Sequence, residues 1–203
     1  MDLYFITHRP YYDVIESVKL ALKTGIKVIQ YREKEKNYPL LFETAEKIRT
    51  LTTQHNAIFI VNDYIDLAIR VNADGIHLGQ ADGNLEQIRK QYHELIIGRS
   101  THNLQQAIEA EQQGADYIGV GPIYATTTHQ NPDPVVGIAL LKQIRKTVKL
   151  PIIPNGGITK EKVPEILSTE TTSMAILQGI LTNKDIEKEM KEKGVRKPAI
   201  ESI

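Results

Sequence analysis

Short apolar runs recur along this chain, and each one stops at polar or glycine residues of the kind that enzymes use. Seven runs are clear and an eighth is less typical; their endings lie at residues 8, 31–34, 62–63, 77–80, 99–100, 119–122, 155–157 and 178–179. In a parallel α/β barrel the carboxyl ends of all strands surround one mouth, so residues far apart in the sequence can meet there. The recurrence therefore predicts an enzyme.

Segments with helical periodicity separate these runs. They cover residues 14–22, 40–53, 85–92, 104–112, 138–148, 160–167 and 185–192. Strands that alternate with helices pair in parallel through right-handed crossovers, and strands buried on both faces have continuous apolar runs. We therefore expect a single (β/α)8 TIM-barrel domain with parallel strands over residues 1–203, with a loose tail over 194–203.

Two further observations concern the architecture. The string Ala-Asp-Gly-Ile at 73–76 is echoed by Ala-Asp-Tyr-Ile at 115–118, as repeated strand–helix units would be. An open doubly wound sheet has the same alternation, but its Gly-x-Gly-x-x-Gly phosphate motif is missing after the first strand. The glycines cluster late instead, where barrels commonly bind phosphate, at Gly119, Gly121, Gly156 and Gly157. The barrel is therefore favoured over the open sheet.

The charge balance limits the partners of the chain. Its 203 residues carry 25 basic and 25 acidic side chains, so no global field attracts nucleic acid or an anionic membrane. The absence of cysteine excludes disulfides and thiolate metal sites. The sequence has no charged leader followed by an apolar segment and no apolar run of about 18 residues, so we expect neither export nor membrane insertion. We expect a cytoplasmic protein that binds small molecules and neither nucleic acid nor membrane. Association into a homo-oligomer stays open.

The ending of the second run predicts an anion-binding cluster. In an extended strand Gln30, Arg32 and Lys34 point to one face, which places an amide and two cations together. The arginine offers a planar fork to phosphate oxygens and the lysine offers a mobile point charge. The alternative is a solvated strand end in which Arg32 pairs with Glu33 or a helix acid.

Two aspartates follow consecutive predicted strands. Asn62 and Asp63 end the third run, and Asp82 lies beyond the fourth. Neighbouring strands of a barrel would let both carboxylates share magnesium bound to phosphates. Either aspartate could instead be the N-cap of the helix that follows it.

Two loops late in the chain suit phosphate groups. The loop from Gly121 to Pro134 is long for a compact domain and carries three threonines at 126–128, so it resembles a lid, although it could be a surface excursion. Gly156 and Gly157 precede a predicted helix, and their backbone N–H groups can approach an anion closely. We expect a phosphate monoester at these glycines.

Seven strings of this chain, in order, resemble the thiamine phosphate synthase family. They are Gln-Tyr-Arg-Glu-Lys at 30–34, Val-Asn-Asp at 61–63, Ala-Asp-Gly-Ile-His-Leu-Gly-Gln-Ala-Asp at 73–82, Gly-Arg-Ser at 98–100, Ala-Asp-Tyr-Ile-Gly-Val-Gly-Pro-Ile-Tyr at 115–124, Thr-x-Thr at 126–128 and Gly-Gly-Ile at 156–158. The third and fifth strings are specific, whereas Gly-Gly-Ile occurs in many barrels. The resemblance covers nearly the whole chain and implies a (β/α)8 barrel.

The resemblance implies a magnesium-dependent reaction that joins hydroxymethylpyrimidine diphosphate to a thiazole phosphate, giving thiamine phosphate and pyrophosphate. It also implies residue roles. The diphosphate and its Mg²⁺ would be held by Gln30, Arg32, Lys34, Asn62, Asp63 and Asp82, with the two aspartates on the metal. The reacting centre would be lined by Ser100, Thr126 and Thr128, with His129 near the departing pyrophosphate, and the thiazole phosphate would be held by Gly156, Gly157, Gln178 and Gly179.

Three departures from the family pattern affect these roles. His129 follows Thr-x-Thr where the family usually has lysine, and a histidine carries positive charge only when protonated. Gln178 replaces the serine that usually ends the eighth strand, and residues 168–173 replace a Gly-Ala-Asp-Gly string. Asn155 stands where the family usually has an aliphatic or otherwise small residue.

Two other functions stay open. The thiazole tautomerases share the barrel and work without metal; they have a histidine where this chain has Pro122 and commonly lack the metal aspartates. Because Asp63 and Asp82 are both present here, the synthase is favoured. A third reading is a catalytically weak paralogue that binds a thiamine precursor and acts through a partner.

Overall fold

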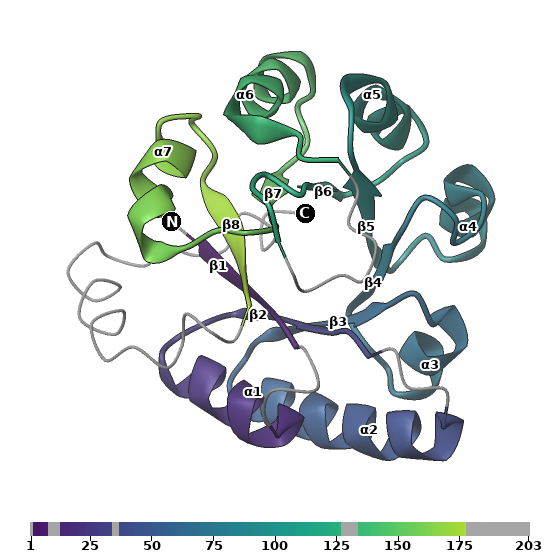
Figure 1. Cartoon of the computed structure of the whole chain (residues 1–203). Helices are drawn as coiled ribbons and strands as arrows, with labels where there is room; N and C mark the ends of the chain where they lie inside the picture. Colours follow the sequence, from purple (N-terminus) through teal and green to yellow (C-terminus); the bar gives the residue numbers. More distant parts are fainter. Residues whose placement is uncertain (1, 8–12, 34–36, 127–133, 178–203) are drawn as a thin grey trace. The chain divides into compact units, whose positions relative to one another are not determined.

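The computed structural model describes residues 2–7, 13–33, 37–126 and 134–177, in which strands alternate with helices (Figure 1). The strands are β1 (Asp2–Ile6), β2 (Val28–Tyr31), β3 (Ile58–Asn62), β4 (Gly75–Leu78), β5 (Ile96–Thr101), β6 (Tyr117–Val120), β7 (Ile152–Pro154) and β8 (Ser173–Leu177). The helices are α1 (Val14–Lys23), α2 (Tyr38–Gln54), α3 (Ile65–Arg70), α4 (Leu85–Gln91), α5 (Leu104–Gln112), α6 (Gly137–Thr147) and α7 (Val163–Leu167), with a 3₁₀ turn, η1 (Lys160–Lys162), before α7.

The strands form one sheet in the order β7-β6-β5-β4-β3-β2-β1-β8. Consecutive strands are therefore neighbours, and β8 lies beside β1. The pairs β1–β2, β2–β3, β3–β4, β5–β6 and β6–β7 are parallel. This is the strand order of a (β/α)8 barrel, so the predicted fold class is confirmed and the doubly wound alternative is wrong.

The described part of the chain divides into two compact units, and their boundary falls inside β4, between His77 and Leu78. The first unit comprises the described residues up to 77 together with 176–177, and the second comprises those of 78–175. A single domain over residues 1–203 stays a prediction, and the tail over 194–203 lies outside the described residues.

In the first unit, α1 and α2 lie side by side along β2 and β3 (Figure 1). Helix α1 buries Val14, Val18, Ala21 and Leu22, the i, i+4, i+7, i+8 stripe of an amphipathic helix. All four residues of β2 are buried, as expected for a parallel strand covered on both faces. The helix and strand patterns of the sequence are thus explained by the same packing.

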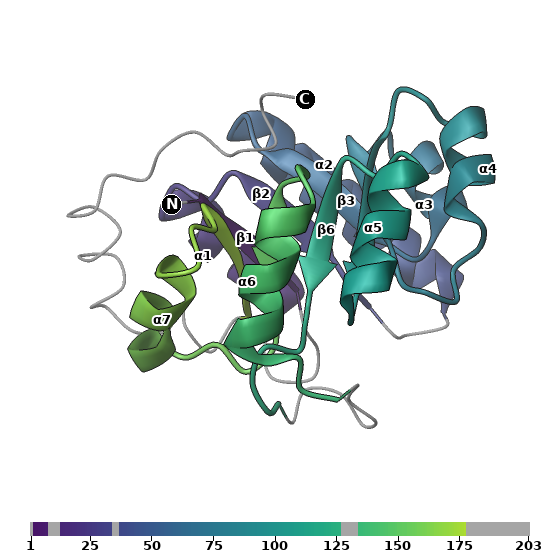
Figure 2. The ribbon, with the colours of Figure 1, turned by 90° about the horizontal axis from the view of Figure 1, so that it is seen from above.

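In the second unit, α5 packs against β5, β6 and α6, and α5 and α6 flank β6 in Figure 2. Tyr117 of β6 is fully buried, and its ring occupies the space beside Gly98 of the neighbouring strand β5. A Cβ atom on residue 98 would overlap that ring, so glycine is required there for packing.

Helix lengths differ from the sequence-based expectation at two places. The periodicity does not predict α3, because its six residues make fewer than two turns. The helix predicted at 160–167 is a 3₁₀ turn followed by a five-residue helix, and the helix predicted at 185–192 lies outside the described residues. Within the described ranges, no helix combines the length and apolar character needed to cross a membrane.

The first copy of the Ala-Asp echo forms a polar cluster at the amino end of β4. Asp74 Oδ2 accepts hydrogen bonds from the Phe59 backbone N–H and from Arg49 Nη1, both at 2.7 Å. The Asp74 N–H donates in turn to the Phe59 carbonyl oxygen at 2.9 Å. One aspartate thus joins the start of β4 to β3 and to an arginine of α2.

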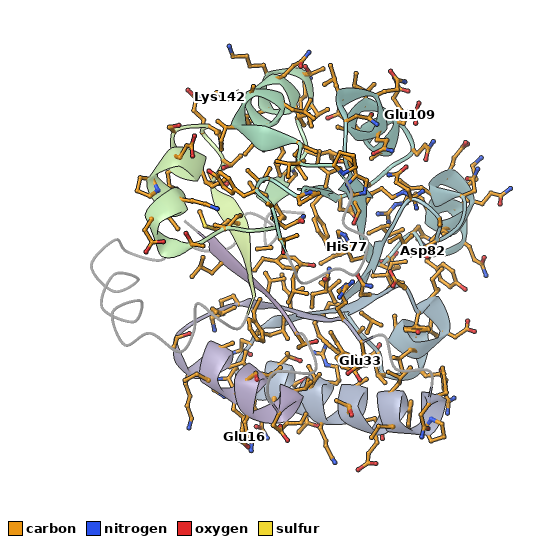
Figure 3. The ribbon with its side chains drawn as sticks, in the orientation of Figure 1. Glu16, Glu33, His77, Asp82, Glu109 and Lys142 are labelled. Atoms are coloured by element: carbon orange, nitrogen blue, oxygen red, sulfur yellow. The ribbon has the colours of Figure 1, made fainter. Side chains whose placement is uncertain are left out.

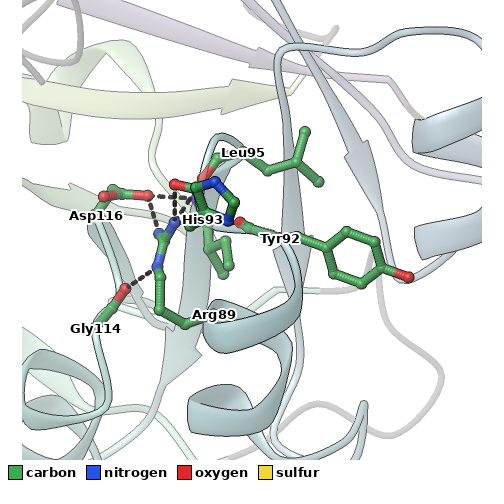
Figure 4. A network of polar contacts seen from close by, with 7 residues as sticks. Arg89, Tyr92, His93, Leu95, Gly114 and Asp116 are labelled. Atoms are coloured by element: carbon green, nitrogen blue, oxygen red, sulfur yellow. Dashed lines mark hydrogen bonds and ion pairs between the residues drawn. The ribbon is translucent and has the colours of Figure 1, made fainter.

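The second copy forms the equivalent cluster at the amino end of β6 (Figure 4). Asp116 Oδ2 accepts from the Ile97 N–H at 2.7 Å and from Arg89 Nη2, and the Asp116 N–H donates to the Ile97 carbonyl oxygen at 2.8 Å. Arg89 also donates to the carbonyl oxygens of Gly114, Tyr92, His93 and Leu95. The repeated Ala-Asp string therefore forms the same arrangement twice: an aspartate before a strand that accepts from the N–H of a neighbouring strand and from an arginine.

Candidate active site

The carboxyl end of β2 carries the first predicted site residue, Gln30. This side chain is only 2% exposed, and its Nε2 donates to the Tyr4 hydroxyl of β1 at 3.0 Å. Tyr4 is also buried, so the amide has a fixed orientation. Tyr4 was not identified as a site residue from the sequence, because an aromatic residue inside an apolar run is indistinguishable from a core residue.

Arg32 follows β2, and the residue after β1, Thr7, holds its backbone. The Thr7 hydroxyl donates to the Arg32 carbonyl oxygen at 3.1 Å and accepts from the Arg32 N–H at 3.0 Å. The Thr7 N–H donates to the Gln30 carbonyl oxygen at 2.9 Å, and Thr7 is fully buried. Thr7 therefore fixes the base from which the Arg32 side chain extends, a role that no sequence motif revealed.

The electrostatic surroundings of Arg32 suit an anion site. Burial lowers the pKa of its guanidinium from the ordinary value, and the carboxylates of Asp63 and Glu33 act in the opposite direction. An arginine stays charged at neutral pH, so the half-buried cation is only partly hydrated. Asp63 raises the pKa of Arg32 more than Glu33 does, so an ion pair with Glu33 alone does not account for the surroundings of Arg32.

Asp63 sits on an unusual backbone at the end of β3. The Tyr64 N–H donates to the Asn62 carbonyl oxygen at 2.8 Å, which closes a three-residue turn with Asp63 at its centre and a φ of 64°. Such positive-φ γ-turns are rare and strained in L-residues, and strain of this kind gathers at functional sites. Asn62 is buried, whereas Asp63 is exposed.

The N-cap alternative for the two aspartates is wrong. Tyr64 occupies the N-cap position of α3 and makes no side-chain cap hydrogen bond. Asn84 occupies that of α4, where its side chain accepts from the Gln87 N–H. Neither Asp63 nor Asp82 is an N-cap residue, so helix capping does not account for either carboxylate.

In the second unit, Asp82 shapes the turn that follows β4. Its Oδ2 accepts from the Gly79 N–H at 2.7 Å. The buried Arg99 of β5 holds the other side of this turn by donating to the carbonyl oxygens of Gln80, at 3.2 Å, and Gly83, at 3.4 Å. Burial lowers the pKa of Arg99, and the charge of Asp82 opposes that shift. Figure 3 shows Asp82 on this turn.

Ser100, predicted to line the reacting centre, lies on β5 and is half-buried. The Gln80 amide donates to its carbonyl oxygen at 2.5 Å, which links the turn after β4 to β5. Beyond it, one ring nitrogen of His102 lies 2.6 Å from the Gly121 carbonyl oxygen at the end of β6. The carboxyl ends of β4, β5 and β6 are therefore connected through polar contacts.

The Gly156–Gly157 turn packs directly on the start of the loop after β6. The Ile123 N–H donates to the Asn155 carbonyl oxygen at 2.8 Å, and the Tyr124 N–H donates to that of Gly156 at 3.0 Å. Asn155, where the family usually has an aliphatic or small residue, therefore contributes its backbone to this contact.

Both glycines of this turn are required by local geometry. Their φ values are 85° for Gly156 and 65° for Gly157. A Cβ on residue 156 would lie 2.5 Å from Pro122, and one on residue 157 would overlap the Ala125 carbonyl oxygen. The double glycine thus has a packing reason beside its predicted phosphate role. The dipole of α7 adds little to that role, because the helix has only five residues.

The described carboxylates suit a metal that arrives with a phosphate ligand. Among the described residues, no group of three or more His, Cys, Asp or Glu could hold a metal ion. Phosphate-bound Mg²⁺ needs only one or two protein carboxylates, because substrate oxygens and water complete its shell. The exposed carboxylate of Asp63 fits this requirement, as does the second oxygen of Asp82.

Several predicted site residues lie at the edge of the described ranges or outside them. Thr126 is half-buried at the end of a described range. Five other predicted residues lie outside the described residues, namely Lys34, Thr128, His129, Gln178 and Gly179. Of the remaining set, β2 and β3 bring together Gln30, Arg32, Asn62 and Asp63 in the first unit. The second unit holds Asp82, Ser100, Gly156 and Gly157.

Comparison with known sequences points to one family. A family model described as thiamine monophosphate synthase matches residues 3–180. A protein of Dictyoglomus thermophilum named thiamine-phosphate synthase is 42% identical over 174 residues, which are 85% of this chain and 78% of that protein. One of Pelotomaculum thermopropionicum with the same name is 42% identical over 189 residues, 91% of this chain and 87% of that protein.

Comparison with solved structures agrees. The structure of thiamine phosphate pyrophosphorylase from Pyrococcus furiosus superimposes with a TM-score of 0.85 at 34% sequence identity. The match covers 99% of this chain and 96% of that one. These relatives carry synthase or pyrophosphorylase names, so the tautomerase alternative gains no support from them.

Proposed function

We infer that this chain, which belongs to the thiamine monophosphate synthase family, makes thiamine phosphate from hydroxymethylpyrimidine diphosphate and a thiazole phosphate. The reaction breaks the C–O bond between the pyrimidinylmethyl carbon and the diphosphate, and the thiazole nitrogen bonds to that carbon. Pyrophosphate leaves with the electron pair of the broken bond. Because the aminopyrimidine stabilises the carbon cation, the protein needs only to position both reactants and stabilise the leaving charge.

Arg32 carries the leaving-group part of this proposal. Its guanidinium is half-buried, its backbone is fixed by Thr7, and its bidentate fork matches phosphate oxygens. Gln30, oriented by Tyr4, and the buried Asn62 would donate hydrogen bonds to the same diphosphate. Lys34 and His129 are proposed to add cations, and Ser100, Thr126 and Thr128 to line the reacting centre.

Magnesium would be held by Asp63, with Asp82 as the second predicted carboxylate. The ion would supply positive charge to the diphosphate oxygens. The strained turn at Asp63 supports this assignment, because it holds an exposed carboxylate on a backbone of positive φ, whose N–H donates to the His77 carbonyl oxygen.

The thiazole phosphate is proposed to bind at Gly156 and Gly157, with contributions from Gln178 and Gly179, which follow β8 in the sequence. Backbone N–H groups in such a turn can donate to a phosphate monoester. We further propose that the enzyme acts in the cytoplasm on small molecules alone, and its oligomeric state is left open.

The observation that carries the proposal is the pair of hydrogen bonds by which Thr7 fixes the Arg32 backbone, together with the attraction between Arg32 and Asp63; both support a role for the Arg32 cation at the diphosphate. Purified protein should form thiamine phosphate and pyrophosphate from both precursors with Mg²⁺, and EDTA should abolish product formation. Tautomerisation of a thiazole carboxylate phosphate without metal would instead identify the protein as a thiazole tautomerase. Precursor binding without either product would indicate the weak paralogue.

A further inference from the structure

Lys162 lies at the Gly156–Gly157 turn, although no sequence pattern selected it. Its Nζ donates to the Gly157 carbonyl oxygen at 3.1 Å. The same ammonium lies over the Tyr124 ring, 4.2 Å from the ring centroid. A carbonyl and an aromatic face therefore hold this cation beside the turn where we place the thiazole phosphate.

Glu165 could form an ion pair with Lys162, because it lies in the first turn of α7 and Lys162 is the N-cap residue of that helix. The Tyr124 hydroxyl instead donates to Glu165 Oε2 at 2.6 Å. In the described part of the chain, the Lys162 ammonium contacts the Gly157 carbonyl oxygen and the Tyr124 ring, and no carboxylate forms an ion pair with it. Tyr124 thus contacts both groups, the ammonium through its ring and the carboxylate through its hydroxyl.

Tyr124 is suited to this task at any physiological pH. Burial, together with the hydrogen bond to Glu165 and its charge, raises the pKa of the Tyr124 hydroxyl to about 12. The hydroxyl therefore stays protonated and continues to donate to the carboxylate. The ring face meanwhile attracts the ammonium without neutralising it.

We propose that Lys162 is a ligand of the thiazole phosphate and that Tyr124, by engaging Glu165, keeps the charge of Lys162 available for that phosphate. The proposal rests on the proposed function, because it takes the phosphate at the double glycine from there. It adds a cation to a turn that would otherwise bind through backbone N–H groups alone. It also offers this chain a substitute for the serine that Gln178 replaces.

Binding of the thiazole phosphate and of its unphosphorylated alcohol, measured by calorimetry, tests the role of Lys162. Lys162→Met should weaken phosphate binding about 10-fold or more, the loss expected for one charge-assisted hydrogen bond. Binding of the alcohol and the KM for the pyrimidine diphosphate should not change. Lys162→Arg should recover part of the affinity. Lys142→Met is the matched control, because Lys142 is exposed on α6 (Figure 3) and should behave as wild type.

The role of Tyr124 is tested by a double variant. Tyr124→Phe keeps the ring but releases Glu165, which can then pair with Lys162, so phosphate binding should weaken. Tyr124→Phe combined with Glu165→Gln removes the competing charge and should restore binding. A double variant as weak as Tyr124→Phe alone would overturn the proposed separation of charges.

The outcomes distinguish this inference from the proposed function. If the wild type makes thiamine phosphate while Lys162→Met binds the thiazole phosphate equally well, only the inference is wrong. If Lys162→Met loses the phosphate and the alcohol equally, or melts well below wild type, Lys162 is structural and the inference is also wrong. If the wild type neither binds the thiazole phosphate nor makes product, both are wrong.

Discussion

Asp74 and Asp116 precede strands, whereas Asp63 and Asp82 follow strands, and the two pairs differ in what their carboxylates contact. Each aspartate at an amino end accepts from a strand N–H and from an arginine. At the carboxyl ends, Asp63 is exposed on a strained turn and Asp82 uses Oδ2 for the Gly79 N–H.

The difference shows how one residue type can serve stability or ligand binding. A carboxylate matched with an N–H and a guanidinium has its charge balanced within the protein and contributes to folding. A carboxylate on backbone that costs about 1–3 kcal/mol of strain is not explained by folding stability. We therefore expect substitutions at the amino ends to change stability and substitutions at the carboxyl ends to change catalysis.

The largest effect is expected at Asp63. Asp63→Asn should lower kcat/KM for the pyrimidine diphosphate by about 100-fold or more, because the amide brings no charge to the metal–diphosphate complex. The KM for the thiazole phosphate should not change. Steady-state kinetics at saturating Mg²⁺ measures both values.

Stability provides the control for this prediction. Asparagine tolerates positive φ, so Asp63→Asn should melt close to wild type, and Asp63→Gly should be at least as stable because glycine relieves the strain. Loss of folded protein in either variant would make Asp63 a structural residue like Asp116 and remove the contrast.

Asp116→Ala should have the next largest effect, and on stability alone. The change leaves Arg89 and the Ile97 N–H without their shared acceptor, which should lower the free energy of unfolding by about 2–4 kcal/mol. Urea unfolding measures the loss. At a temperature where the variant is folded, both KM values should equal those of wild type; a selective rise of one would place Asp116 in the active site.

Asp74→Ala should lower the free energy of unfolding by about 1–2 kcal/mol, less than Asp116→Ala, because water screens the more exposed Arg49–Asp74 pair. The side chain of Asp74 is 38% exposed against 20% for Asp116, and Arg89 makes several further carbonyl contacts. The same urea measurement ranks the two variants. Equal losses would mean that exposure does not set the strength of these clusters.

Substitution of Asp82 should have the smallest effect on stability. Two variants distinguish its structural role in the turn after β4 from its proposed role in binding metal. Asp82→Asn keeps an oxygen that can accept from the Gly79 N–H, whereas Asp82→Ala does not, so the alanine variant should be less stable by about 1 kcal/mol. Both variants should lose Mg²⁺-dependent activity equally if the carboxylate binds metal. Full activity of Asp82→Asn would mean that Asp82 stabilises the turn after β4 and does not bind metal.

Much of the fold was predictable because its signals are local. Continuous apolar runs and amphipathic segments report burial on two faces or on one, and their alternation limits the topology. The echo around Asp74 and Asp116 was visible for the same reason. Helix α3 was missed because six residues carry too little periodicity.

The sequence by itself determined the strand–helix order, the parallel sheet and the residue types at the strand ends, since these follow from periodicity and residue chemistry. Only the tertiary structure revealed that Thr7 fixes Arg32, that Asp63 lies on a strained turn and that Lys162 meets Tyr124. These contacts join residues from different elements or depend on backbone angles. Spacing along the chain does not reveal such contacts or angles, because the packing of the elements decides which side chains meet and which backbone angles each turn adopts.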